Sequence, residues 1–129
     1  MLSQFWLPLV VKFLICLVTV AGVEERSNSA LAVLLKDFKL ALGKKSPAPD
    51  GVRVRAKTGT LNFVSSLAGF VEVRNGRKLS FAIFTADTAR RDAIPPAERE
   101  RPQGAKSWSR RSRQLQKELI RSWAQSFGV

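Results

Sequence analysis

The alternation of hydrophobic and polar positions divides the chain into segments, and the first of these is almost purely apolar. Residues 13–23 form an uncharged, mostly apolar run. This run suits the hydrophobic region of a signal peptide better than a membrane span, which needs about twenty residues. We expect residues 1–23 to form a signal-like or anchor segment with a hydrophobic helix, which contacts a membrane through residues 5–23. A plain core helix and a displaced sequence without function remain alternatives.

A helical pattern follows this segment. Five apolar residues repeat at the spacing of one helix face: Leu31, Leu34, Leu35, Phe38 and Leu42. Ser27 is a suitable N-cap, and Gly43 is a suitable C-terminal stop. The pattern predicts a helix over residues 27–43, followed by a loop over residues 44–51, which contain two prolines and a glycine.

The pattern then changes to period two. Residues 52–57 alternate between apolar and basic side chains, which predicts a strand with one buried face and one basic face. Residues 66–74 and 77–85 predict two further strands, and Asn75-Gly76 between them predicts a two-residue type I′ turn. The last strand is apolar on both faces, so we expect both of its faces to be covered.

The C-terminal part contains a loop and a closing helix. Residues 86–105 are rich in proline and charge, which predicts a loop with at most one helical turn. Residues 106–127 predict a helix with an apolar stripe of Trp108, Leu115, Leu119, Trp123 and Phe127. This helix either packs on the sheet with its basic side chains in water or lies on an anionic membrane. The predicted fold class is α+β, with about three antiparallel strands and flanking helices.

Composition limits the chemistry of the chain. Its 129 residues are enough for one small domain, which we place at residues 24–129. There is no histidine and only one cysteine, which excludes a Ser-His-Asp triad, a histidine metal site and an internal disulfide within this chain. We expect no metal and no cofactor. The net charge of +12 favours polyanions such as nucleic acid or anionic lipid as partners.

One motif carries specific chemistry. Residues 55–69 read RAKTGTLNFVSSLAG, in which Lys57-Thr58-Gly59 ends the first predicted strand. A strand, this tripeptide, an antiparallel hairpin and a closing helix follow one another as in penicillin-binding proteins and serine β-lactamases. The wording of residues 57–61 and 64–69 resembles the D-alanyl-D-alanine carboxypeptidases/endopeptidases called low-molecular-mass class C penicillin-binding proteins. The resemblance covers residues 31–129, so we expect a partial domain of the penicillin-binding-protein/β-lactamase type.

The resemblance implies roles for four residues. Lys57 would place a positive charge near the substrate carboxylate, and Thr58 would hydrogen-bond to that carboxylate. Gly59 would let the substrate backbone approach the strand, and the N–H of Thr60 would be half of the oxyanion hole. The implied substrates are peptidoglycan stem peptides ending in D-Ala-D-Ala, with β-lactams as their mimics, and the implied location is the periplasm or cell envelope.

Two motifs of that family are missing. No serine is followed three positions later by lysine, and no Ser-x-Asn occurs. The chain therefore lacks the nucleophile, has no catalytic residue of its own, and is expected to be inactive alone unless the missing part is supplied. A misplaced start, a frameshift or a new signal fused to a remnant would each explain residues 1–23. The alternative functions are a non-catalytic envelope protein and a small basic nucleic-acid-binding protein. We also expect a strand edge and part of a sheet face to be bare.

Overall fold

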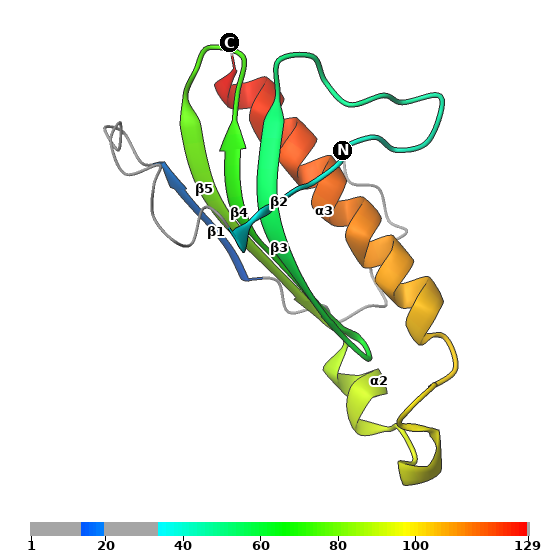
Figure 1. Cartoon of the computed structure of the whole chain (residues 1–129). Helices are drawn as coiled ribbons and strands as arrows, with labels where there is room; N and C mark the ends of the chain where they lie inside the picture. The colour runs from blue at the N-terminus through cyan, green and yellow to red at the C-terminus, as the bar shows by residue number, and fades with distance from the viewer. Residues whose placement is uncertain (1–13, 20–33, 129) are drawn as a thin grey trace.

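The computed structural model describes residues 14–19 and 34–128, and their strands form one antiparallel sheet (Figure 1). The spatial order is β1 (Leu14–Thr19), β5 (Lys78–Ala86), β4 (Val64–Glu72), β3 (Arg53–Leu61) and β2 (Lys36–Asp37). The long strands β3, β4 and β5 are joined by hairpins and pair without a register break. They confirm the three predicted strands and the α+β class.

One long helix covers one face of this sheet. Helix α3 (Ala105–Phe127) runs along β3, β4 and β5, whereas α2 (Thr88–Asp92) lies beyond the end of the sheet, before a short 3-10 turn at Pro96–Glu98 (Figure 1). Alternate residues of the three strands point at α3, and their apolar members form the core: Val54, Ala56, Leu67, Val71, Leu79, Phe81 and Ile83. Within the described residues, no helix is long and apolar enough to cross a membrane.

The predicted helix over residues 27–43 is wrong for its described part. Residues 27–33 lie outside the described residues, and Lys36 and Asp37 form a strand that pairs with Ala56 and Arg55. Residues 38–40 fit a period of two as well as a helical period: Phe38 and Leu40 pack on the core while Lys39 is exposed. The open edge of β3 offers unpaired main-chain groups, and pairing with them decides between the two patterns.

The N-terminal prediction is mostly outside the described residues. Of the predicted hydrophobic helix in residues 1–23, only residues 14–19 are described, and there the chain is strand β1 rather than helix. Leu14 pairs with Phe84 and Thr19 with Leu79, so β1 extends the sheet beside β5. An uncharged run of this length suits a strand beside a sheet edge as well as a helix.

The β4–β5 hairpin is confirmed, but its turn differs from the prediction. The N–H of Val73 donates to the C=O of Arg77 at 2.9 Å, which leaves a three-residue loop, residues 74–76. Only Gly76 of this loop has a positive φ, at 81°. Such a loop with its last residue left-handed is the usual alternative to the type I′ turn. The Asn75 side chain accepts a hydrogen bond from the N–H of Arg77, and this bond stabilises the loop.

Two burial predictions also need correction. β5 is covered on one face, and Phe84 on its other face is 47% exposed. The buried stripe of α3 is offset from the predicted one, which supplies only Trp108 and flanking contacts, and it consists of Ala105, Trp108, Ser112, Gln116, Ile120 and Ala124. The offset arises because polar residues of α3 have partners in the sheet. The Gln116 amide donates to the Ser65 hydroxyl at 3.0 Å, and Ser112 bonds to Thr85.

Candidate substrate-binding strand

The outer edge of β3 changes character at Ala56. Up to Ala56 this edge is paired with β2, and the N–H of Phe38 donates to the C=O of Val54 at 2.9 Å. Strand β2 ends there, and no described strand pairs with this edge over residues 57–61. All five of these residues are exposed. The four predicted site residues, Lys57, Thr58, Gly59 and Thr60, therefore lie together on an open strand edge.

The pairing of β3 fixes which main-chain groups face this edge. In an antiparallel strand the N–H and C=O of one residue point to the same side, and the side alternates along the chain. The C=O of Val54 points to β2, so the main-chain groups of Ala56, Thr58 and Thr60 share that outer side. The N–H of Thr60 is thus directed off the sheet at the position where the resemblance requires a donor.

The face of β3 away from α3 is strongly basic. Arg53, Arg55 and Lys57 are all exposed on this face, as the period-two pattern predicts. The Lys57 ammonium donates to the C=O of Thr58 at 3.2 Å, so it lies against the open edge. The Arg55 guanidinium donates to the C=O of Leu35 at 3.2 Å and holds the segment that precedes β2. A carboxylate at the open edge would therefore meet Lys57 first.

Gly59 is required inside the sheet itself. A Cβ at this position would lie 2.5 Å from the Ser66 hydroxyl, on the residue paired with Gly59 in β4. Ser66 Oγ in turn donates a long hydrogen bond of 3.5 Å to the C=O of Gly59. The structure thus gives Gly59 a packing role on the sheet face, in addition to the substrate approach that the resemblance implies.

The turn that follows β3 is anchored on both sides. Phe63 is only 3% exposed and has a positive φ of 57°, which a bulky residue adopts only when its surroundings hold it there. Its ring packs edge-on against Trp108 at 6.1 Å between centroids. The Asn62 amide donates to the C=O of Arg99 at 2.6 Å, and Arg91 donates to the C=O of Asn62. The end of β3 is therefore held in one position.

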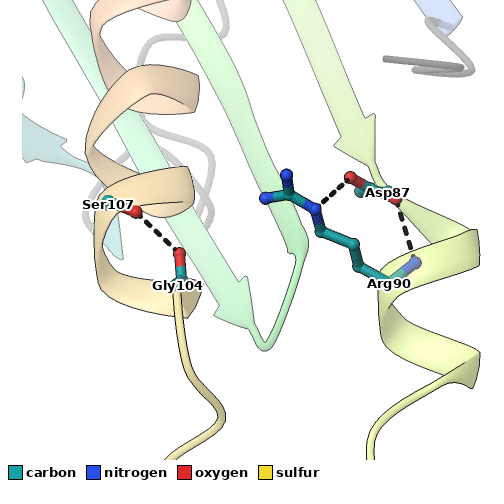
Figure 2. A network of polar contacts seen from close by, with 4 residues as sticks. All are labelled: Asp87, Arg90, Gly104 and Ser107. Carbon is teal, nitrogen blue, oxygen red and sulfur yellow. Dashed lines mark hydrogen bonds and ion pairs between the residues drawn. The ribbon is translucent and has the colours of Figure 1, made fainter. Parts of the chain in front are cut away.

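Polar contacts at the helix starts on either side of this turn reinforce it. Figure 2 shows Asp87, which caps α2 by accepting from the N–H of Arg90 at 3.1 Å and pairs with the guanidinium of the same residue at 3.5 Å. On the other side, the Ser107 hydroxyl donates to the C=O of Gly104 at the start of α3. The N–H of Asp87 also donates to the C=O of Phe63 at 2.8 Å. These bonds connect α2 directly to the β3–β4 turn.

The sequence pattern did not reveal a groove beside the end of β3. It has a volume of about 550 Å³ and is lined by Thr60, Leu61, Asn62, Ala105, Lys106, Ser109, Arg110 and Arg113. Its two walls are more than forty residues apart in the chain, so no local pattern brings them together. The spacing of Lys106, Arg110 and Arg113 on one helix face is the signal that was available. No group of three metal-ligating side chains lies within residues 14–19 and 34–128.

Comparison with family models assigns the class of protein. The model of the D-Ala-D-Ala carboxypeptidase 3 (S13) family matches residues 19–104, which include β3, its open edge and the whole sheet except most of β1. The chain belongs to this peptidase family. The match begins earlier than the resemblance seen in the sequence and ends before α3. Comparison with curated proteins and with solved structures found no match to this chain.

Proposed function

We propose that this chain provides the substrate-binding strand of a serine-type D-Ala-D-Ala carboxypeptidase that acts on peptidoglycan stem peptides in the cell envelope. In this proposal the C-terminal carboxylate of the peptide lies beside Lys57 and Thr58. The scissile carbonyl accepts from the N–H of Thr60, and the peptide pairs along the edge of β3 as an added strand. The chain alone does not hydrolyse the peptide, because it has no Ser-x-x-Lys motif.

One observation supports this proposal above the others. The edge of β3 is closed by β2 as far as Ala56 and is open at the four residues that match the family motif. An open edge that presents alternating N–H and C=O groups is a template for an extended peptide. A lysine at the start of that open stretch supplies the charge that a terminal carboxylate needs. Family membership places a D-Ala-D-Ala peptide first among such ligands.

The test supplies the missing motifs in a second polypeptide. The purified chain would be incubated with a fluorescent penicillin, alone and with a co-expressed segment of a full-length family member that carries Ser-x-x-Lys and Ser-x-Asn. We expect no labelling of the chain alone and labelling of the serine of the added segment when both are present. Release of D-Ala from a stem peptide would be measured in the same mixtures.

A pair of lysine variants sharpens this test. Lys57→Ala should lower the labelling rate about ten-fold or more, because the ligand carboxylate loses its charged partner. Lys78→Ala removes another exposed lysine from the sheet and should leave the rate unchanged. Equal labelling with Lys57→Ala and the unchanged chain would overturn the role of Lys57. Release of D-Ala by the chain alone would overturn the proposed inactivity.

A further inference from the structure

The basic groove beside the end of β3 is placed where a bound peptide would continue. It lies between the last residues of β3, Thr60 and Leu61, and the first two turns of α3. In the proposed function the terminal carboxylate lies at Lys57 and the scissile carbonyl at Thr60. The peptide therefore runs antiparallel to β3, and its residues before D-Ala-D-Ala pass Leu61 and Asn62. Those two residues form one wall of the groove.

The opposite wall carries three cations without counterions. Lys106, Arg110 and Arg113 repeat at i, i+4 and i+7, so their side chains share one face of α3, and all three are exposed. No acidic residue is among those that line the groove. Within the described part of the chain, no hydrogen bond or ion pair engages these three side chains.

The other basic residues of the same helix behave differently. Lys117 donates to the C=O of Ala41 at 2.9 Å. Arg121 donates to the C=O of Pro47 at 2.7 Å and to the Ser46 hydroxyl at 3.0 Å. These two side chains hold the loop that follows β2. The cations of the groove have no such structural partner, so their mutual repulsion is relieved only by an added anion.

We propose that this groove is a subsite for carboxylate groups in the part of the peptide that precedes D-Ala-D-Ala. The inference rests on the proposed function for its direction along β3, and it adds a preference for acidic peptides. Ser109 and Asn62 contribute uncharged hydrogen-bonding groups beside the three cations. The wall at Asn62 is held by Arg91 and by the C=O of Arg99, so the groove exists before the ligand arrives.

The test compares three acetylated pentapeptides by isothermal titration calorimetry with the full chain. The first has three glutamates before D-Ala-D-Ala, the second has three glutamines there, and the third has three glutamates before L-Ala-L-Ala. We expect the first to bind about ten-fold more tightly than the second at about 50 mM NaCl. The difference should shrink at about 200 mM NaCl, because salt screens exposed charges.

Matched variants separate the groove from overall charge. The triple variant Lys106→Gln, Arg110→Gln, Arg113→Gln should lose the glutamate preference and keep the affinity for the glutamine peptide. The triple variant Arg77→Gln, Lys78→Gln, Arg111→Gln removes the same charge elsewhere on exposed positions and should keep the preference. Circular dichroism of both variants checks that the fold is unchanged. A glutamate preference that both triple variants retain in full would overturn the groove proposal.

The variant Lys57→Ala distinguishes failure of the groove from failure of the proposed function. If Lys57→Ala weakens both D-Ala-D-Ala peptides and glutamate brings no gain, the groove proposal is overturned and the substrate strand stands. If glutamate brings the gain while Lys57→Ala and the L-Ala-L-Ala ending change nothing, the groove is supported and the substrate strand is overturned. Tighter, groove-dependent binding of a short thymidine oligonucleotide would overturn the peptide assignment in favour of nucleic acid.

Discussion

The two halves of β3 differ in almost every respect, although they belong to one strand. In the first half, residues 53–56, the outer edge is closed by β2, and Val54 and Ala56 are 3% and 5% exposed. In the second half, residues 57–61, the outer edge is open within the described residues and every side chain is exposed. The first half is therefore held on an edge and a face, whereas the second half keeps its edge for another chain.

The layers beneath the two halves differ in chemistry as well. Beside Val54, the paired residues Val71 and Leu79 are fully buried and apolar, and Ile120 and Ala124 of α3 complete this core. Beside Thr60, the paired residues are Ser65 and Thr85, which hydrogen-bond to Gln116 and Ser112 of α3. No buried side-chain polar atom in the described residues lacks a partner.

This difference shows how one strand can be both scaffold and site. Apolar packing at one end anchors β3 without any need for direction. Directional hydrogen bonds at the other end hold the strand at a defined angle while its edge stays open. An open edge is a risk for aggregation, and the exposed Phe70 and Phe84 on the uncovered face add to that risk. The expected bare edge and bare face are thus both present.

The largest effect is expected from a change against the first half. A Cβ at Gly69 would lie 2.7 Å from the Cα of Ala56 and would also meet the C=O of Arg55. Because both contacts are with backbone, Gly69→Ala should force β3 and β4 apart and lower the free energy of unfolding by about 3 kcal/mol. Urea unfolding followed by circular dichroism measures this loss. A loss under about 1 kcal/mol would show that the strands adjust freely here.

A smaller effect is expected from the polar layer beneath the second half. Gln116→Leu keeps the volume of the side chain but leaves the buried Ser65 hydroxyl without its donor. We expect a loss of about 2 kcal/mol in the free energy of unfolding. The double variant Gln116→Leu, Ser65→Ala removes both polar groups and should recover at least half of that loss. If the double variant is less stable than Gln116→Leu, the hydrogen bond is not the reason for the loss.

The smallest effect is expected at the glycine of the second half. Gly59→Ala places a Cβ against the hydroxyl of Ser66, which is a side-chain atom that can rotate away. The free energy of unfolding should fall by about 1 kcal/mol or less, well below the effect at Gly69. Adding Ser66→Ala should remove the loss, because only the hydroxyl is in close contact. Equal losses at Gly59 and Gly69 would erase the difference between the two halves.

Much of the fold and the candidate strand could be predicted from local pattern. Alternation over residues 52–57, the Asn75-Gly76 turn and the periodicity of residues 106–127 each predict one element, and each is present. The positions of Lys57, Thr58, Gly59 and Thr60 at the end of a basic strand were also predictable, because period two decides which side chains share a face. Their roles with a substrate stay a prediction.

Other features depended on partners that are distant in sequence. The segment around Lys36 and Asp37 has a pattern that fits helix and strand, and only the free edge of β3 decides for strand. The buried stripe of α3 includes Gln116 because Ser65, 51 residues away, accepts its hydrogen bond. A hydrophobicity pattern counts such a residue as exposed, so it places the stripe on the leucines beside it.

The sequence by itself determined the order of the strands along the chain, the basic face of β3, the Lys-Thr-Gly-Thr segment and the absence of a Ser-x-x-Lys nucleophile. These are properties of residue type and short spacing. The tertiary structure alone decided that β2 stops at Ala56, that the edge beyond it is open, and that three cations of α3 face the end of β3. Edges and grooves form between elements, so their chemistry depends on which segments meet in space.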